Sequence, residues 1–372
     1  MKILHLGKYY PPYFGGIEKV NFDLVESINE SGYNADVLCF NHKPGFSIED
    51  NGNKVYRTST ITSAFSSPLS ISVFKQIRKI YHQYDIIHLH VPNPMGAVAL
   101  QSVPFKGKII VHWHSDIIKQ KLLKKFYKPF QNKLLQRADK IIVTSPNYLE
   151  GSEDLKPYKE KCTIIPIGIS NSEFITDEKF RYKLRHQYKN KKVIFSMGRL
   201  IYYKGFEYLI DAAKELPEDF IILIGGTGLL KNKLQEQIAK YKLENKVFLL
   251  GRIPFEQLGE YYRRADIYCL SSTERSEAFG VVLIEAMSFG CPIVSTNISG
   301  SGAPWVNQNN KTGIVVEPKS SHALAKAIIE ITNDSEKKDK FSKNALERYC
   351  SIFEKHKMAE KTIELYNSLL QA

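Results

Sequence analysis

The chain has 372 residues, of which 43% are hydrophobic and 24% charged, the balance of a soluble globular protein long enough for two domains. Five scattered cysteines argue against a disulfide framework or a zinc site and favour a reduced compartment, and no stretch of about 20 apolar residues predicts a transmembrane helix. The net charge of +13 permits nucleic acid, an anionic membrane surface or an anionic small molecule as partner.

The first half of the chain alternates short apolar strands with helical segments. Apolar residues at helical spacing from Ile17 to Ile28 predict a helix directly after the first strand. Near-continuous apolar strands separated by helices indicate a parallel sheet that is covered on both faces. The strands are predicted over residues 2–6, 34–40, 85–91, 107–113 and 139–145.

The same alternation restarts in the second half. Residues 169–191 are polar and charged and show no strand pattern, so we interpret them as the region that links two domains. The domains are expected over residues 1–175 and 176–353, with a C-terminal helix over about 354–372 packed back on the first. The second series of strands is predicted over residues 191–198, 219–226, 246–251, 265–272 and 291–296.

This pattern predicts an α/β protein with two Rossmann-like, doubly wound domains that face each other across a cleft. Ligands of such sheets bind beyond the carboxyl ends of the strands. The loops that follow the predicted strands are therefore where functional residues are expected.

Two of these loops have the composition of phosphate-binding loops. Gly15 and Gly16 come just before a predicted helix, whose free N–H groups and partial positive charge suit an anion. An ordinary tight turn is the alternative. Arg199 and Lys204 follow the strand that ends at Gly198, and two cations there suit a diphosphate. The alternative is a pair of solvated surface cations.

The segment "SEAFGVVLIEAMSFGCPIVST", residues 276–296, carries two carboxylates around a run apolar enough to be buried. Glu277 precedes the predicted helix and Glu285 lies about two turns into it. A buried carboxylate needs a partner, and the hydroxyl pairs of a sugar or a ribose are suitable. An internal salt bridge from Glu285 to Arg199 or Lys204 is the alternative.

The start of that helix offers backbone groups as well. The amides of Phe279, Gly280 and Val281 are placed to receive a phosphate. One element is thus expected to hold a sugar, a diphosphate and a ribose in that order.

Together these motifs resemble the retaining glycosyltransferases of the two-domain GT-B fold, in particular glycosyltransferase family 4, along the whole chain. The Glu-x7-Glu motif "EAFGVVLIE" is the most specific element, followed by "GRLIYYKG" and "GGIE". The resemblance implies that Glu277 faces the donor sugar and that Glu285 holds the nucleotide ribose. It also implies contacts with the donor diphosphate for Arg199, Lys204, Gly15 and Gly16.

A third site follows the strand in "KIIVHWHSD". The family has a histidine there that reaches the donor sugar and the reacting centre, and His114 matches it. His112 lies on the same strand face two residues earlier, so the assignment between the two stays open, and a purely structural histidine is the alternative. The "PWVNQ" form around Trp305 resembles members that build bacterial polysaccharides, which favours GDP-mannose over a UDP-sugar.

The resemblance implies hexosyl transfer with retention of the anomeric configuration, with Glu277, His114, Arg199 and Lys204 as catalytic residues. The nucleotide diphosphate leaves, while the cations and the helix-start amides stabilise the charge that develops on it. The chain contains no Asp-x-Asp pair, so we expect no metal ion to bridge the diphosphate and no cofactor.

Residues 119–140 hold eight Lys and Arg residues and one acid, with apolar residues at helical spacing. A basic amphipathic helix predicts contact with an anionic membrane surface, and a packed helix with a solvated basic face is the alternative. We expect a cytoplasmic protein, peripheral at the inner face of the membrane, that acts on a lipid-linked or polysaccharide acceptor in cell-surface glycan synthesis. The expected membrane contacts are Lys121, Lys124, Lys125 and Lys128.

Three other classes stay open. A sugar-nucleotide epimerase of the same architecture would convert the donor without an acceptor, and a phosphorylase would need pyridoxal phosphate on a lysine. A non-enzymatic nucleic-acid binder would need a concentrated basic face with stacking aromatics. It would leave the two glutamates unexplained, so no nucleic-acid partner is expected.

Overall fold

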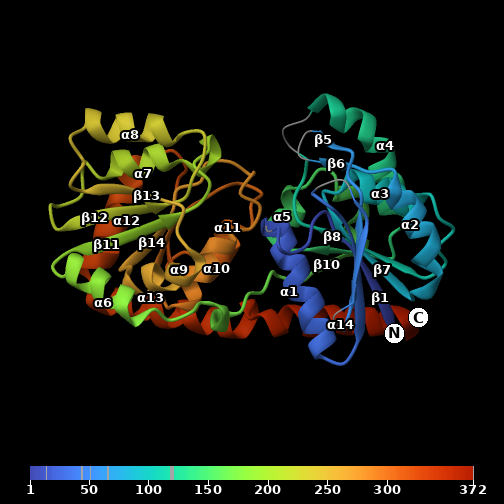
Figure 1. Cartoon of the computed structure of the whole chain (residues 1–372). Helices are drawn as coiled ribbons and strands as arrows, with labels where there is room; N and C mark the ends of the chain where they lie inside the picture. Colours follow the sequence, from blue (N-terminus) through green and yellow to red (C-terminus); the bar gives the residue numbers. More distant parts are fainter. Residues whose placement is uncertain (14, 43–44, 51, 65–66, 118–120, 372) are drawn as a thin grey trace. The chain divides into compact units, whose positions relative to one another are not determined.

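The computed structural model describes the chain except residues 14, 43–44, 51, 65–66, 118–120 and 372, and it leaves the side chains of residues 63–64, 67 and 121–125 undescribed. The chain divides into two compact units (Figure 1). Unit 1 consists of Met1–Gly168 and Lys355–Ala372, and unit 2 consists of Ile169–Glu354. Each unit is built on its own sheet.

Unit 1 contains an eight-stranded sheet of order β10-β9-β8-β7-β1-β2-β4-β3 and a separate pair, β5 and β6. The neighbours in the large sheet are parallel except β3 with β4. Because the chain moves outward from β1 first in one direction and then in the other, the winding reverses between β1 and β7. The strands are β1 Lys2–Leu6, β2 Asn34–Phe40, β3 Ser47–Asp50, β4 Lys54–Thr58, β5 Thr62–Ala64, β6 Ser67–Leu69, β7 Ile86–Val91, β8 Lys108–Trp113, β9 Lys140–Val143 and β10 Cys162–Ile164.

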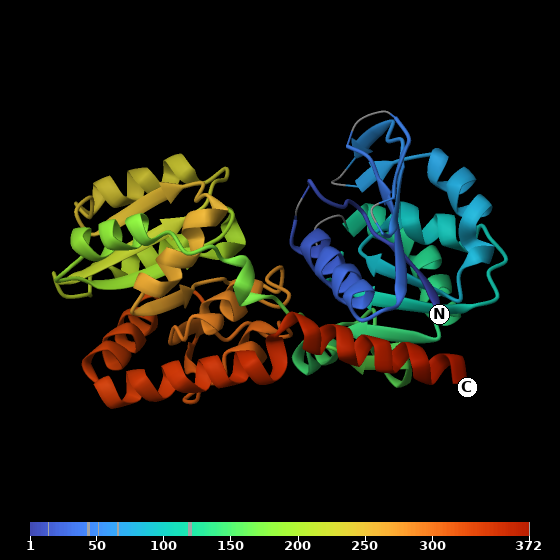
Figure 2. The same cartoon turned by 60° about the horizontal axis from the view of Figure 1, so that its bottom comes forward.

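Helices cover this sheet, and the last one comes from the far end of the chain. The helix α14 lies against α1 (Figures 1 and 2), and its Asn367 Nδ2 donates to Tyr33 Oη, in the turn after α1, at 3.4 Å. Its Tyr366 is fully buried and reaches side chains of the sheet itself. The helices are α1 Gly16–Glu30, α2 Ser72–Ile80, α3 Pro94–Gln101, α4 Lys121–Arg137, α5 Pro146–Gly151 and α14 Lys355–Gln371.

Unit 2 contains a six-stranded sheet of order β13-β12-β11-β14-β15-β16 in which all neighbours are parallel. Counted along the chain, this is the strand order 3-2-1-4-5-6 of a Rossmann-like sheet, and its winding reverses between β11 and β14. The strands are β11 Lys192–Met197, β12 Phe220–Gly225, β13 Val247–Gly251, β14 Ile267–Leu270, β15 Ile293–Thr296 and β16 Gly313–Val316.

Successive residues of the central strand face opposite layers of helices. Ile194 of β11 belongs to the core that α7, α8 and α12 close, whereas Phe195 packs edge-on against Tyr262 of α9, 5.2 Å between ring centroids. The sheet is therefore buried on both faces, which is why its strands are apolar throughout. The helices are α6 Glu178–Gln187, α7 Phe206–Ala212, α8 Lys231–Lys240, α9 Phe255–Arg264, α10 Val281–Ser288, α11 Ala303–Val306, α12 Ser321–Asn333 and α13 Ser335–Arg348.

The stretch interpreted as a link between domains is mostly a structured part of unit 2. It forms α6, which Asp177 caps by accepting from the amide of Phe180 at 2.9 Å. Arg181 of this helix donates to the buried carboxylate of Glu260 at 2.8 Å, which fixes α6 on α9. The polar composition reflects a helix that buries only Leu184, and such a helix has no apolar period to detect.

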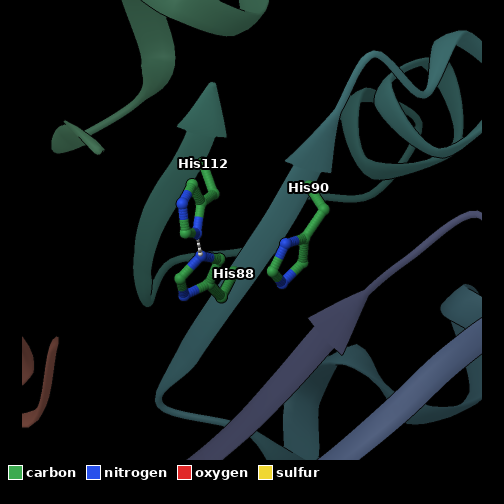
Figure 3. Close-up of side chains that lie close together, drawn as sticks. All are labelled: His88, His90 and His112. Atoms are coloured by element: carbon green, nitrogen blue, oxygen red, sulfur yellow. Dashed lines mark hydrogen bonds between the residues drawn. The ribbon is translucent and has the colours of Figure 1, made fainter. Parts of the chain in front are cut away.

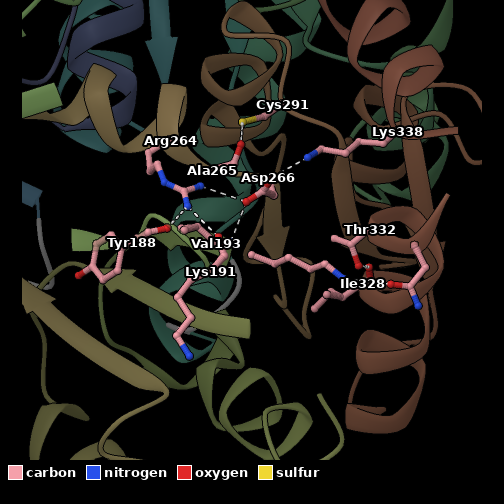
Figure 4. Close-up of polar contacts among 12 residues, drawn as sticks. Tyr188, Lys191, Val193, Arg264, Ala265, Asp266, Cys291, Ile328, Thr332 and Lys338 are labelled. Atoms are coloured by element: carbon pink, nitrogen blue, oxygen red, sulfur yellow. Dashed lines mark hydrogen bonds and ion pairs between the residues drawn. The ribbon is translucent and has the colours of Figure 1, made fainter. Parts of the chain in front are cut away.

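The amino ends of the unit 2 strands are held by a network around Asp266 (Figure 4). Its carboxylate accepts from the amide of Val193 at 2.8 Å, from Arg264 at 3.1 Å and from Lys338 at 2.5 Å. Burial acts to raise the pKa of Asp266, but the hydrogen bonds from Lys338 and Val193 outweigh it and hold the pKa below its usual value. This network anchors the edge of the sheet opposite to the one where loops follow the strands.

Candidate active site

In unit 2 the loops after β11 and β14 meet where the winding of the sheet reverses. Gly205 has a φ of +62°, and a Cβ there would lie 2.2 Å from the carbonyl oxygen of Ser271, so the close approach requires glycine. Ser271 Oγ donates to the carbonyl oxygen of Lys204 at 3.0 Å. These contacts lock the two loops together and fix the backbone that carries Lys204.

Lys204 and Glu277 form a buried ion pair at this point. The Lys204 Nζ and Glu277 Oε2 atoms are 2.6 Å apart, and each residue is 8% exposed. Ser272 Oγ donates to the same Oε2 at 2.8 Å. Among the described residues both hydrogen bonds to this carboxylate go to Oε2, so Oε1 is the oxygen available to a sugar hydroxyl.

The helix α10 begins beside this pair. Gly280 is its N-cap with a φ of +84°, and no side chain caps the helix in the described part of the chain. Phe279 is buried, which holds the turn in place, and Val281 opens the helix. The first amides of a helix have no partner within it and carry its partial positive charge, so they suit an anionic ligand.

Glu285 lies in the middle of α10 and is half-buried. Its Oε2 accepts from Tyr262 Oη at 2.6 Å. Burial, and then the neighbouring carboxylate of Glu285, raise the pKa of Tyr262 well above its usual range, so its hydroxyl stays a donor. Of the two motif glutamates, Glu277 forms the salt bridge with Lys204.

Arg199 differs from Lys204 in that its side chain is exposed. Its Nη2 atom is 3.5 Å from Tyr203 Oη, too long for a strong hydrogen bond. The guanidinium is therefore not held in place by this contact, and it is accessible to an anion.

In unit 1, Gly15 and Gly16 lie at the start of α1, as the sequence predicts, and both are exposed. Gly15 is the N-cap, without a side-chain cap within the described residues. A Cβ at Gly15 would meet Glu18 Oε2 at 2.3 Å, so the carboxylate of Glu18 already lies against this end of the helix. A phosphate bound here must displace it.

His114 follows β8 and belongs to a cluster of five histidines on β1, β7 and β8. His112 and His114 stack with their ring centroids 4.1 Å apart, because residues two apart on a strand share a face. Burial lowers the pKa of His114 to about 3 and the pKa of His112 well below its usual value. Both rings are therefore neutral at pH 7.

The rest of this cluster was not foreseen. The sequence signal was present, since "HLH" on β7 and "HWH" at β8 alternate in step on neighbouring strands. What the sequence did not reveal is that β1 and α14 bring two further polar groups to the same place. The missed members are His5, His88, His90 and Tyr366.

Three of these histidines come close enough to be considered as metal ligands (Figure 3). One nitrogen from each of His88, His90 and His112 lies within 4.8 Å of the others, and all three side chains are buried. However, the rings of His88 and His90 are stacked with an interplanar angle of 12°, so their in-plane lone pairs do not converge on one point. His88 Nε2 and His112 Nδ1 already form a hydrogen bond at 3.3 Å.

Comparison with known proteins decides the family. The family models "Glycosyltransferase Family 4" and "Glycosyl transferases group 1" match residues 14–173 and 177–348. The O-antigen chain mannosyltransferase C of Escherichia coli is 32% identical over 376 residues, covering 100% of both chains. The D-rhamnosyltransferase WbpZ of Pseudomonas aeruginosa is 31% identical over 355 residues, 95% of this chain and 92% of that one.

The chain belongs to glycosyltransferase family 4. The crystal structure of HepE from Anabaena in complex with UDP superposes with a TM-score of 0.81 at 23% identity and covers 99% of this chain and 100% of that one. Units 1 and 2 are thus the two Rossmann-like domains of a GT-B fold, and the family and fold expected from the three sequence motifs are confirmed.

The predicted membrane helix of this glycosyltransferase is only partly described. It forms α4 over Lys121–Arg137, but the side chains of Lys121, Lys124 and Lys125 lie outside the described residues. Lys128 forms an ion pair with the buried carboxylate of Asp154, so it is less available than expected. In the described part of the chain, no helix has both the length and the apolar character that a membrane span requires.

Proposed function

We propose that this glycosyltransferase moves a hexosyl unit, with retention, from a nucleotide diphosphate sugar to a lipid-linked or polysaccharide acceptor in cell-surface glycan synthesis. GDP-mannose is the favoured donor, and a UDP-sugar is the alternative. The buried Lys204–Glu277 pair beside the uncapped start of α10, at the point where the sheet reverses its winding, carries the proposal. The similarity to a mannosyltransferase along the full length supports the choice of donor.

Glu277 accepts hydrogen bonds from hydroxyls of the donor sugar on Oε1, and Glu285 accepts hydrogen bonds from the ribose hydroxyls. Lys204 is already neutralised by Glu277. The negative charge of the diphosphate is therefore met by Arg199 and the amides of α10, which need no metal ion to do so. We also propose that Gly15 and Gly16 contact the donor diphosphate, which would displace the carboxylate of Glu18 from this end of α1.

The reaction joins the acceptor hydroxyl oxygen to the anomeric carbon and breaks the bond from that carbon to the diphosphate oxygen. Attack from the leaving-group face lets the acceptor proton pass to the departing diphosphate. The pKa of about 3 makes His114 a poor general base. We therefore assign His114 to hydrogen bonding with the donor sugar rather than to proton abstraction.

The proposal is tested by incubating the protein with GDP-mannose, GDP-rhamnose, UDP-glucose and UDP-N-acetylglucosamine, with and without lipid-linked glycan acceptors. We expect GDP release with GDP-mannose that depends on the acceptor, and an α-linked product by NMR. Conversion of the donor without any acceptor would identify an epimerase instead. A β-linked product from an α-linked donor would contradict retention.

We further propose that α4 places the enzyme at the anionic inner face of the cytoplasmic membrane. Phe126 and Phe130 are 79% and 48% exposed and lie four residues apart, so they share one face of a basic helix. Exposed aromatic side chains on a basic helix suit the lipid interface, where each nearby cation contributes about 1 kcal/mol.

Vesicle sedimentation tests this surface. Replacing Lys121, Lys124, Lys125 and Lys128 with Gln, or Phe126 and Phe130 with Ser, is expected to release the protein from vesicles that contain anionic lipid and to leave nucleotide binding unchanged. The matched control removes four charges elsewhere by replacing Lys231, Lys233 and Lys240 of α8 and Lys242 just after it, all exposed, with Gln. If the control releases the protein as effectively as the α4 variants, net charge rather than this helix accounts for the binding.

A further inference from the structure

Five histidines of unit 1, which are His5, His88, His90, His112 and His114, lie on one face of three neighbouring parallel strands or directly after one of them. His5 of β1 is in register with His88 of β7, and His90 of β7 with His112 of β8. Along a strand the rings stack, with centroids 4.7 Å apart for His88 and His90. Across strands they meet end to end, because side chains in a parallel sheet lean along the strand direction.

Each ring forms a hydrogen bond with a histidine of the neighbouring strand, two residues beyond the position that is its partner in the strand register. His5 Nδ1 and His90 Nε2 are 3.1 Å apart, and His90 Nδ1 and His114 Nε2 are 2.9 Å apart. The rings of His90 and His114 are nearly coplanar, with an interplanar angle of 11° and centroids 5.2 Å apart, as in-plane hydrogen bonding requires. This arm ends at His114.

A second arm starts at His112, and a tyrosine joins the two. His88 Nε2 and His112 Nδ1 are 3.3 Å apart, and His88 Nδ1 is 2.5 Å from Tyr366 Oη. The same hydroxyl is 3.4 Å from His5 Nε2. The six groups therefore form one hydrogen-bonded chain with five links, and Asn21 contacts it at His5. Its order is His112, His88, Tyr366, His5, His90 and His114.

The two ends of this chain are alike. His112 Nε2 and His114 Nδ1 are buried, and neither has a hydrogen-bond partner among the described residues. His114 lies just past the carboxyl end of β8, the edge of such a sheet at which ligands bind. The end nitrogen of His114 is thus placed to meet a ligand, whereas His112 lies two residues deeper in the sheet.

The number of protons in this hydrogen-bonded chain requires all its hydrogen bonds to run in the same direction. A neutral imidazole has one N–H and one lone pair, and a phenol has one O–H, so six groups supply six protons for five links. Burial keeps every one of these histidines neutral by lowering its pKa. Each group inside the chain must donate on one side and accept on the other, and the sixth proton is left at one end.

We propose that this chain fixes the tautomer of His114, so that Tyr366, His5 and His90 act as positioning residues for it. With the pairings observed, all five histidines carry their proton on Nδ1 or all five carry it on Nε2. In the first state His114 offers an N–H donor to the ligand, and in the second it offers a lone pair. Only the use of this nitrogen in catalysis rests on the proposed function, because the tautomer is a property of the free protein.

The alternatives explain less. A metal ion at His88, His90 and His112 would have to break the hydrogen bond between His88 and His112 and reorient two stacked rings. Independent packing of five histidines would leave three matched nitrogen pairs and two contacts with the Tyr366 hydroxyl without a reason, since apolar side chains would fill the same layer without any polar group to satisfy.

The test is NMR of the full-length protein with 15N-labelled histidine, freed of metal by a chelator and without substrate. We expect His5, His88, His90, His112 and His114 to show one common tautomer at pH 7, read from their 15N shifts. His42, His82, His186, His322 and His356 serve as internal references. Different tautomers within the five, or a charged imidazolium among them, would overturn the proposal. So would metal-shifted signals of His88, His90 and His112 on addition of Zn²⁺.

The substitution Tyr366→Phe removes only the hydroxyl that joins the two arms. We expect at least one arm to become a mixture of tautomers or to switch, and kcat to fall about tenfold with the donor KM unchanged. Tyr33→Phe also removes a tyrosine hydroxyl that contacts α14, through Asn367, but none of its hydrogen bonds goes to a histidine of the cluster, so it should change neither. An unchanged common tautomer in Tyr366→Phe would show that Tyr366 does not join the arms. If the tautomers respond but the activity does not, the chain stands and the catalytic use of His114 fails.

Discussion

The two domains of this glycosyltransferase bury polar groups by opposite means. Unit 1 buries five imidazoles that are kept neutral, and each needs only hydrogen bonds from its neighbours. At its candidate site unit 2 buries the ion pair of Lys204 with Glu277, and each member depends on the charge of the other. A neutral array tolerates many members and can set a direction for hydrogen bonding, whereas a charged pair is costly to disturb and responds to an anionic ligand.

The two domains should differ most in their stability toward acid, and this is the largest effect we expect. Burial lowers the pKa of His5 and His114 from 6.5 to about 3. The unfolded chain therefore binds protons below pH 6.5 that the folded one does not. The stability contributed by these neutral rings is complete above pH 6.5 and is lost as the pH falls toward 3, by up to about 1.4 kcal/mol per group and pH unit.

Unit 2 lacks such a cluster in its described residues. Its carboxyl group with a lowered pKa, that of Asp266, affects stability in a different pH range. The contribution of Asp266, whose folded pKa lies below 3.8, is lost only as the pH falls below that value. Pulsed hydrogen exchange between pH 7 and 4 should therefore show β1, β7 and β8 losing protection before β11, β12 and β14. Earlier loss of protection in unit 2 would contradict the contrast between the domains.

Removal of one member of the ion pair should come next in size. Lys204→Met leaves the carboxylate of Glu277 buried beside one hydroxyl donor, and the expected loss of unit 2 stability is about 3–5 kcal/mol by urea unfolding. Adding Glu277→Gln to it should recover part of this loss without restoring activity. The control is Lys214→Met, because Lys214 is exposed and solvent screens its pairing with Asp211. Equal losses for Lys204→Met and Lys214→Met would show that burial of the pair does not matter.

A smaller effect, on nucleotide affinity, should distinguish the role of Glu285 from that of Glu277. Glu285→Ala removes the carboxylate assigned to the ribose, so nucleotide affinity should fall by roughly 10- to 100-fold. Tyr262→Phe keeps the carboxylate and removes only its hydroxyl partner, and it should weaken binding less. Isothermal titration with GDP and UDP measures both variants. A Glu285→Ala affinity within about twofold of the parent would make Glu285 structural.

The sequence predicted the central strands of both domains well because apolar runs are local signals. The strand expected over 2–6 is β1, and the one expected over 85–91 differs from β7 by one residue. The sequence did not predict the helix α6, because only Leu184 of this helix is buried and no apolar period exists. Edge strands such as β3 were also missed, since three of its four residues are exposed.

The site was predicted less completely because its geometry is not local. The sequence marked Lys204 and Glu277 as important, but their pairing joins residues 73 apart and follows only from the order of the strands. In the same way the histidines on β7 and β8 were visible, whereas the link through Tyr366 depends on a helix 278 residues away from His88. Residue types can thus be read from the sequence, but their partners require the fold.

The last test expects no effect at all. Excess EDTA should leave the transfer rate unchanged, because Arg199 and the first amides of α10 already supply positive charge for the diphosphate. Initial rates are measured after dialysis against EDTA and again with added Mg²⁺ or Mn²⁺. Activity that is lost on dialysis and returns only with a metal ion would contradict metal independence. The comparison of the domains then tells where the ion acts: shifted 15N signals of His88, His90 and His112 would place it in unit 1. Unshifted histidines together with metal-dependent nucleotide affinity would place it at the diphosphate in unit 2.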